Sequence, residues 1–124
     1  MGENILLIED EEIVVKSIAK LLKKNGYKVT IAHRGIEALE AVKKERYNLL
    51  ICDVRMPGMD GIDTIKEIRK YLQAEGKSLI PEVVITGYAD EDKYKEAVKL
   101  KVADYLYKPF NINDFLEVVK RNLK

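Results

Sequence analysis

The sequence predicts an α/β fold in which five strand-helix units surround a parallel sheet. Short apolar runs rich in β-branched residues alternate with longer segments whose apolar residues recur at helical spacing. Turn-forming residues separate the two kinds of segment. The length of 124 residues, 47% of them hydrophobic, suits a core that needs neither disulfides nor a structural metal. We therefore expect a single domain over residues 1–124.

Five runs have the composition of strands that are buried on both faces. They are rich in Ile, Val, Leu and Tyr, and they are too short for ordinary helices. We expect strands at Asn4–Ile8, Lys28–Ala32, Leu49–Cys52, Glu82–Thr86 and Asp104–Tyr107.

The segment after each run carries apolar residues on one helical face and mostly charged residues on the other. In chain order, the apolar positions are Val14, Ile18, Leu21 and Leu22; Ile36, Leu39 and Val42; Ile62, Ile65, Ile68 and Leu72; Tyr94, Ala97 and Val98; and Ile112, Phe115, Leu116 and Val119. Turn signals separate several units: Asn25-Gly26, Pro57-Gly58, and Gly76 ahead of Pro81.

Composition excludes several classes of function. Lys plus Arg number 22 against 21 Asp plus Glu, so the net charge of +1 gives no general reason to bind nucleic acid or a membrane. One cysteine, Cys52, and one histidine, His33, make neither a disulfide framework nor the usual zinc site. No long apolar run indicates a signal peptide or a membrane span. We expect a soluble, cytoplasmic protein.

Polar residues follow the predicted strands where ligands bind in open parallel sheets, beyond the carboxyl ends of the strands. Glu9 and Asp10 follow the first strand, and Asp53 follows the third. Thr86 ends the fourth strand, and Lys108 follows the fifth. Three carboxylates, a hydroxyl and an ammonium group should therefore meet at one edge of the sheet.

Carboxylates packed together repel one another unless a proton or a cation offsets their charge. Mg²⁺ needs only one or two carboxylates plus phosphate oxygens, which matches Asp10 and Asp53 with Glu9 nearby. Ca²⁺ fits less well because no EF-hand spacing occurs. Lys108 and Thr86 would face an anion that arrives at Asp53. The set predicts a carboxylate that becomes an acyl phosphate.

Four segments resemble, in order and spacing, the motifs of the response regulator receiver family of two-component systems, including its chemotaxis receivers. They are Ile5–Glu11, Asp53–Gly61, Ile85–Gly87 and Asp104–Phe110. The resemblance spans almost the whole chain. It implies a doubly wound (βα)5, flavodoxin-like fold, with a five-stranded parallel sheet in the order 2-1-3-4-5 and five flanking helices.

The resemblance implies a role for each residue of the metal site. Asp53 would accept a phosphoryl group from a histidine kinase, and Asp10 would bind Mg²⁺ directly. The backbone carbonyl of Arg55 would complete the metal site, and Glu9 would be an outer acidic partner. Glu9 departs from the family, which more often has Asp there, and its longer side chain would alter metal affinity or water positioning.

The resemblance also implies a two-state switch. Lys108 would offset the charge of the phosphoryl group, Thr86 would close onto its oxygens, and Tyr105 would fill the space that Thr86 vacates. The surface around the fourth helix, fifth strand and fifth helix would then change. A second departure is Lys101, where the family commonly has glycine after the fourth helix; a left-handed cap there would be strained or replaced.

The implied partners are a sensor histidine kinase or phosphotransfer protein and a downstream output protein or a missing output domain. We expect no output domain within residues 1–124, and no direct contact of this domain with nucleic acid or membrane. The chain would not be an enzyme for a separate substrate, since it would catalyse only its own phosphoryl transfer and autodephosphorylation. The sequence leaves open whether it acts alone or belongs to a longer regulator.

Three other functions compete with this interpretation. A phosphatase of the haloacid dehalogenase type needs a second acid two residues after Asp53, where this chain has Arg55. A flavodoxin-like FMN carrier needs a phosphate loop after the first strand, where the acidic residues 9–12 would repel phosphate. A receiver that only docks to partners would not need the acidic pair, Asp53 and Lys108. We assign Cys52 to packing and His33 to an exposed turn.

Overall fold

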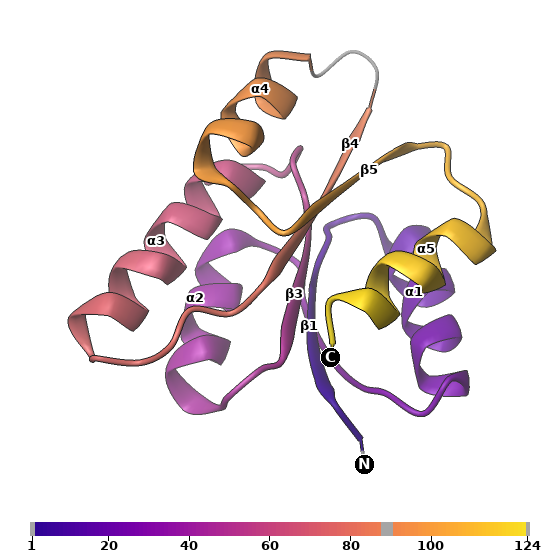
Figure 1. Cartoon of the computed structure of the whole chain (residues 1–124), viewed down its shortest axis with the longest axis horizontal. Coiled ribbons are helices and arrows are strands. Elements are labelled where there is room, and N and C mark those ends of the chain that lie inside the picture. The colour runs from indigo at the N-terminus through magenta and orange to yellow at the C-terminus, as the bar shows by residue number, and fades with distance from the viewer. Residues whose placement is uncertain (1, 88–90, 124) are drawn as a thin grey trace.

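The computed structural model describes residues 2–87 and 91–123, and in this part of the chain five parallel strands form one sheet (Figure 1). The strands are β1 (Asn4–Ile8), β2 (Lys28–Ala32), β3 (Leu49–Asp53), β4 (Glu82–Gly87) and β5 (Asp104–Lys108). Their order is β2-β1-β3-β4-β5, and every neighbouring pair is parallel. The predicted fold class and strand order are confirmed, and β3, β4 and β5 each extend one residue beyond the prediction.

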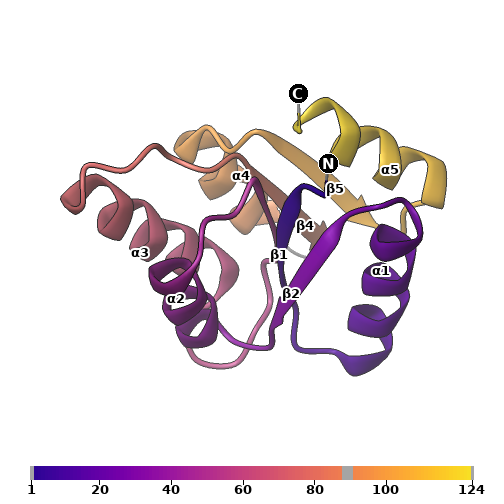
Figure 2. The same ribbon diagram turned by 90° about the horizontal axis from the view of Figure 1, so that it is seen from below.

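A helix follows each strand and covers one face of the sheet. The helices are α1 (Glu12–Lys24), α2 (Gly35–Lys44), α3 (Gly61–Ala74), α4 (Glu91–Leu100) and α5 (Ile112–Arg121). Helices α2, α3 and α4 lie on one face, and α1 and α5 lie on the other (Figures 1 and 2). No helix among the described residues is long and apolar enough to cross a membrane.

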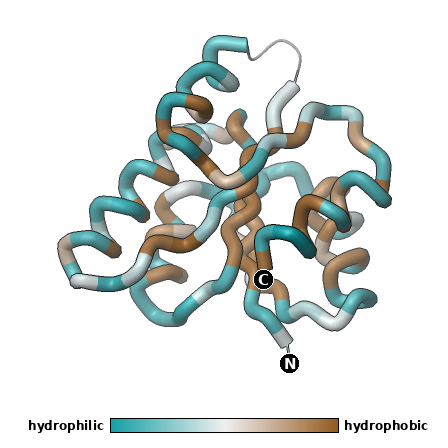
Figure 3. Tube along the Cα trace, in the orientation of Figure 1, coloured by the Kyte–Doolittle hydropathy of each residue, from teal (hydrophilic) through white to brown (hydrophobic). Residues whose placement is uncertain are grey.

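The sheet is buried on both faces, which explains its nearly continuous apolar strands. In β1, Leu6 and Ile8 belong to the core under α2 and α3, whereas Ile5 and Leu7 belong to the core under α1 and α5. Figure 3 shows apolar residues along the central strands and hydrophilic residues on the outer sides of the helices. The two apolar layers hold the sheet rigid, so the residues at its edge have a fixed support.

Three residues assigned to apolar helix faces are exposed instead. Ile36, Val98 and Ile112 expose 57%, 44% and 61% of their surface. A helix on a sheet buries one stripe, and apolar residues at its margin stay in contact with water. In α2, Gly35, Ala38 and Val42 form the buried stripe. The all-buried face predicted for α3 is confirmed.

Lys101 adopts the left-handed conformation after α4, with a φ of 57°. The turn keeps the geometry that glycine would give, and the Lys101 N–H donates to the Val98 carbonyl at 3.0 Å. This conformation costs a non-glycine residue about 1 kcal/mol. Arg69 of α3 binds the end of α4 because its Nη1 donates to the Leu100 carbonyl at 2.7 Å. Of the two alternatives expected at Lys101, a strained left-handed cap or a different turn, the chain adopts the left-handed cap.

Candidate phosphoacceptor and metal site

The site residues meet at the carboxyl edge of the sheet. Strand β3 lies between β1 and β4, so Asp53 at its end is adjacent to the segment that follows Ile8. Asp53 pairs in register with Ile85, and Lys108 pairs with Gly87 at the end of β5. The parallel register therefore brings together side chains that are up to 99 positions apart in the sequence, Glu9 to Lys108.

Asp53 is 4% exposed and uses both carboxylate oxygens. Its Oδ1 accepts from the Arg55 N–H at 3.0 Å, and its Oδ2 accepts from Lys108 Nζ at 2.6 Å. Gly61 permits this arrangement, since a Cβ there would lie 2.3 Å from the Asp53 carbonyl oxygen. The carboxylate is thereby held in one orientation, with a cation on one oxygen.

Glu9 is completely buried beside this pair. Its Oε2 accepts from the Glu11 N–H at 3.2 Å, and its Oε1 lies 3.7 Å from Lys108 Nζ. Burial, followed by the nearby Asp53 carboxylate, raises the pKa of Glu9 to about 8. Burial alone would lower the pKa of Lys108, but the hydrogen bond to Asp53 and the charges of Asp53 and Glu9 outweigh it and raise that pKa.

Three carboxylates form a cluster that suits a divalent cation. Oxygens of Glu9, Glu11 and Asp53 all lie within 4.8 Å of one another. Lys108 supplies one positive charge, whereas the cluster carries two negative charges while Glu9 keeps its proton and three once Glu9 ionises. In the part of the chain that the structure describes, Glu9 Oε1 is also buried without a hydrogen-bond partner. An oxygen-rich cluster with an orphaned carboxylate oxygen fits a hard cation such as Mg²⁺.

Glu11 belongs to the cluster but was not among the predicted site residues, although it lies in the run of four acidic residues after β1. Asp10, expected as a direct ligand, lies outside that cluster and is half-buried in the wall of an adjacent hollow of about 580 Å³. Arg55, Asp60 and Lys93 line the same hollow. Val54, the residue after Asp53, also lines the hollow, which therefore lies beside the edge where Asp53 ends β3.

The two expected switch residues lie on the neighbouring strands β4 and β5. Thr86 is completely buried, and its Oγ1 has no hydrogen-bond partner among the described residues. Tyr105 is half-buried, and its ring meets Tyr94 of α4 edge-on at 5.1 Å between centroids. Tyr94 in turn lies 5.3 Å from Tyr107. An aromatic chain therefore connects β5 to α4 near the site.

Cys52 and His33 have the structural surroundings expected of them. Cys52 is buried, and burial followed by the Asp53 charge raises the pKa of its thiol well above the ordinary value. A thiol of this kind is a packing residue because it does not ionise. His33 lies in the turn before α2, where its Nε2 is 2.7 Å from Glu12 and its Nδ1 is 3.8 Å from Glu37.

Comparison with known proteins shows the family of this chain. The family model described as "Response regulator receiver domain" matches residues 5–120. The transcriptional regulatory protein ZraR of Klebsiella oxytoca is 36% identical over 110 residues, which are 89% of this chain and 24% of that protein. Sporulation initiation phosphotransferase F of Bacillus subtilis is 31% identical over 123 residues, 99% of this chain and 95% of that protein. The chain thus spans about a quarter of the ZraR regulator.

Solved structures of receiver proteins have the same fold as this chain. Chemotaxis protein CheY4 of Vibrio cholerae superposes with a TM-score of 0.87 at 28% identity, covering 99% of this chain and all of that one. The receiver domain of the Pseudomonas aeruginosa sensor histidine kinase PA1611 superposes with a TM-score of 0.84 at 28% identity, covering 99% and 98%. That structure has a magnesium ion coordinated in its active site cleft. The chain belongs to the response regulator receiver family, the phosphorelay domains of two-component signal transduction.

Proposed function

We propose that Asp53 accepts a phosphoryl group from a phosphohistidine and that Mg²⁺ assists the transfer. The observation that carries the proposal is the fixed, almost buried Asp53 carboxylate, with Lys108 Nζ at 2.6 Å and the carboxyl groups of Glu9 and Glu11 beside it. A buried carboxylate that only stabilised the fold would not need two further acids beside it, because each adds repulsion.

In the proposed reaction, a carboxylate oxygen of Asp53 attacks phosphorus in line with the bond to the donor imidazole nitrogen. The P–O bond forms as the P–N bond breaks, and the bonding electron pair returns to the imidazole. The product is a mixed anhydride on Asp53. The Lys108 ammonium group would then donate to the phosphoryl oxygens, which carry the negative charge of the product. The Arg55 N–H would continue to donate to the other carboxylate oxygen of Asp53.

Residues of the acidic cluster and of the adjacent hollow would together hold the cation. Asp10, Asp53 and the Arg55 carbonyl would bind it, with Glu9 as an outer acidic partner, and Glu11 is an additional candidate because its carboxylate lies in the cluster. When bound, Mg²⁺ offsets the negative charge that gathers as the phosphoryl group approaches the carboxylate. Autodephosphorylation reverses the modification when water attacks phosphorus and inorganic phosphate leaves Asp53.

The proposed switch follows from the orphaned hydroxyl of Thr86. A buried hydroxyl without a partner costs about 1 to 3 kcal/mol, and a phosphoryl oxygen on Asp53 would accept its hydrogen bond. Movement of Thr86 toward the phosphoryl group would free space for Tyr105. Because Tyr105 contacts Tyr94, its movement would change the surface formed by α4, β5 and α5.

A histidine kinase or phosphotransfer protein is the proposed donor, and two exposed isoleucines support a docking surface for it. Ile13 in the first turn of α1 is 81% exposed, and Ile112 in the first turn of α5 is 61% exposed. They flank the acidic edge, since α1 begins after the Glu9 segment and α5 after the Lys108 segment. In this proposal, both isoleucine side chains lie within the surface that the donor covers. The output partner, in another protein or another domain, would read the α4-β5-α5 surface.

The test is intact mass spectrometry after incubation with acetyl phosphate, with Mg²⁺ and with a chelator. The wild type should gain one phosphoryl mass only with Mg²⁺, and Asp53→Asn should gain none. Asp63→Asn, a change of the same kind on the exposed side of α3, is the matched control and should behave as wild type. Absence of the adduct on wild type with Mg²⁺, from acetyl phosphate and from a phosphorylated histidine kinase alike, would support the alternative of a receiver that only docks.

A further inference from the structure

A second hollow, of about 540 Å³, lies at the opposite edge of the sheet from Asp53. It is formed between the end of α2 and the segment that follows α3, ahead of the first residues of β3 and β4. The length of β3 places it about 13 Å or more from the phosphoacceptor. Its volume is that of a small-molecule site, within the usual range of several hundred Å³.

The hollow has an apolar floor and a cationic rim. Val42, Leu72 and Ile80 form the floor, and each is at most 4% exposed. The rim carries four cations: Lys43, Lys44, Arg46 and Lys77. Such a division, apolar below and charged above, suits a molecule with an apolar body and a negatively charged end.

The positive charge of the rim is largely uncompensated. Within residues 2–87 and 91–123, none of the four cations has a carboxylate at ion-pair distance. Glu45 lines the hollow, but its carboxylate accepts hydrogen bonds from Asn4 and Tyr47. The carboxyl ends of α2 and α3 contribute about half a negative charge each, so an excess of about two positive charges remains after Glu45 is counted.

Three of these exposed cations contact neutral groups. The Lys43 and Lys77 ammonium groups lie 5.8 Å and 5.3 Å from the centre of the Tyr71 ring, and Lys77 Nζ also donates to the Tyr71 hydroxyl at 3.3 Å. Arg46 Nη1 donates to the Ser78 carbonyl at 2.8 Å. Tyrosine and carbonyl partners fix the cations without removing their charge. An arriving anion would therefore meet an arranged set of donors.

We propose that this hollow binds a nucleoside diphosphate or a similar small organic phosphate, independently of Asp53. The phosphates would contact Lys43, Arg46 and Lys77, and the base would lie on the apolar floor. The hollow is open to solvent, but its volume of about 540 Å³ matches a small ligand, whereas nucleic acid or an acidic peptide would need an extended cationic face. Inorganic phosphate alone would leave the apolar floor unused.

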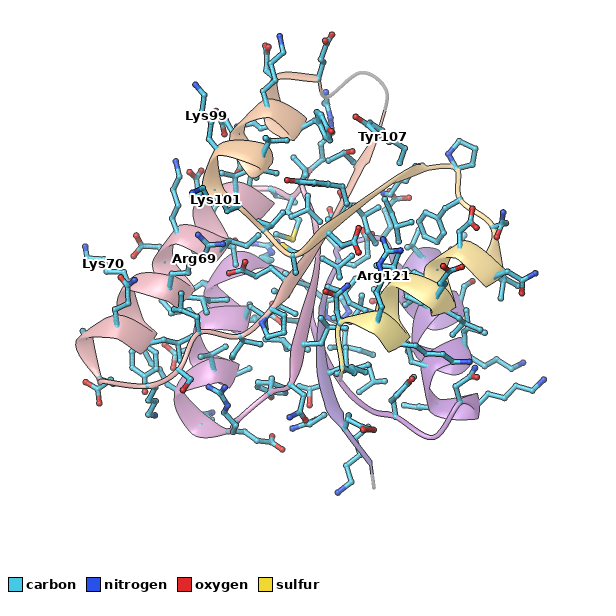
Figure 4. All side chains as sticks on the ribbon, in the orientation of Figure 1. Arg69, Lys70, Lys99, Lys101, Tyr107 and Arg121 are labelled. Carbon is cyan, nitrogen blue, oxygen red and sulfur yellow. The ribbon has the colours of Figure 1, made fainter. Side chains whose placement is uncertain are left out.

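The experiment is a titration of the full chain with ADP, in a chelator, followed by two-dimensional amide NMR. We expect saturable shifts confined to residues 42–46 and 76–80. Lys43→Gln/Lys77→Gln should weaken binding about tenfold or more, because each lost charge removes a charge-assisted hydrogen bond. Lys70→Gln/Lys99→Gln removes the same charge from side chains that project outward from α3 and α4 (Figure 4) and should leave binding unchanged.

Adenosine without phosphate should fail to bind at the same concentrations, and pyrophosphate should bind more weakly than ADP. The amide spectra of both double variants show directly whether they are folded. Absence of saturable shifts with ADP would overturn the proposal, as would an equal loss of binding in the Lys70/Lys99 variant. Tighter binding of a single-stranded oligonucleotide or of a polyglutamate peptide at this edge would overturn it too.

Discussion

Lys108 Nζ donates a hydrogen bond of 2.6 Å to Asp53 Oδ2, although 55 positions separate the two residues in the sequence. The contact exists because β5 and β3 both end at the same edge of the sheet, with β4 between them. It places a positive charge where a phosphoryl group on Asp53 would carry its negative oxygens.

Lys108→Met should slow phosphorylation by acetyl phosphate about 100-fold, because one preorganised donor to the reacting oxygens is lost. The measurement is the rate at which the phosphoryl adduct appears in intact mass spectra at saturating Mg²⁺. Lys99→Met, on the exposed side of α4, is the control and should keep the wild-type rate. Equal rates for Lys108→Met and wild type would remove Lys108 from the mechanism.

Glu9 should make the metal-free protein less stable as pH rises. Its pKa is raised to about 8 in the folded state, whereas an unfolded Glu ionises near 4.5. Between these values the folded chain binds a proton that the unfolded chain has lost, so the free energy of unfolding falls with rising pH and levels off above about 8. Urea denaturation in a chelator, repeated from pH 5 to 9, measures this slope.

Glu9→Gln is the matched variant for that series, since it keeps the size of the side chain and cannot ionise. Between pH 5 and 8, the free energy of unfolding of Glu9→Gln should fall less steeply with rising pH than that of wild type. Mg²⁺ should bind wild type more tightly at pH 8 than at pH 6, because binding favours the ionised carboxylate. A wild-type slope identical to that of Glu9→Gln would show that Glu9 is already ionised at neutral pH.

Asp60 both caps α3 and forms an ion pair with Lys93, and two substitutions distinguish these roles. Its side chain caps α3 by accepting from the Asp63 N–H at 2.9 Å, and it pairs with Lys93 of α4 at 2.7 Å. Asp60→Ala should lower the free energy of unfolding by about 1 kcal/mol or more, whereas Asp60→Asn keeps the cap and should cost about 0.5 kcal/mol. Urea denaturation at pH 7 measures both, and equal losses would contradict the capping role.

The pH dependence of Asp60 has the opposite sign from that of Glu9. Burial alone would raise the pKa of Asp60, but the hydrogen bonds from Lys93 and from the Asp63 N–H outweigh it and lower that pKa. Its contribution to stability is present above the ordinary pKa of Asp and is lost as pH falls through the lowered value. The Asp60→Asn and wild-type stabilities should therefore converge in acid.

Removing one partner of the Arg69–Glu82 ion pair should lower the stability of the fold strongly, whereas replacing both partners by apolar residues should lower it little. Glu82 is buried at the start of β4, and both its oxygens accept from Arg69, at 2.7 Å and 2.8 Å. Arg69→Met leaves a buried carboxylate unpaired and should cost about 3 to 5 kcal/mol. Arg69→Met/Glu82→Leu should recover most of that loss in urea denaturation. A double variant as unstable as the single one would contradict this.

Ile13→Ala should reduce phosphoryl transfer from a protein donor about fivefold or more, because an exposed apolar contact beside the site is lost. Labelling by acetyl phosphate should stay unchanged, since the small donor does not dock on α1. Leu79→Ala is the control: Leu79 is 46% exposed, but it lies before β4 at the other edge of the sheet. Equal effects of the two substitutions would contradict a donor surface at α1.

The strands and the acidic edge could be predicted from the sequence because both depend on local patterns. A strand buried on both faces is apolar along its whole length, and β1 and β2 have the predicted bounds. Helix faces were predicted less well, because the apolar residues of α1 cover a wider arc than the stripe that packs. In α1, Val15 and Ala19 are buried, whereas Val14 and Leu21 lie at the margin.

Contacts between distant residues could not be predicted in this way. Nothing local indicates that Glu82, a charge in an apolar strand, pairs with Arg69 among 22 basic residues. The carboxylate cluster likewise depends on how the loop after β1 turns, which brings Glu11 toward Glu9 and Asp53 and leaves Asp10 in the adjacent hollow. Spacing alone cannot distinguish among four consecutive acids.

The most direct test of the account is to locate the phosphoryl group chemically. After incubation with acetyl phosphate and Mg²⁺, borohydride reduces an acyl phosphate to the alcohol, so a phosphorylated aspartate becomes homoserine and is identified by peptide sequencing in the mass spectrometer. We predict homoserine at position 53, dependent on Mg²⁺ and absent when the chelator is present. Homoserine at position 10 or 60 instead, or none while the adduct is present on the intact protein, would contradict the assignment of Asp53 as the phosphoacceptor.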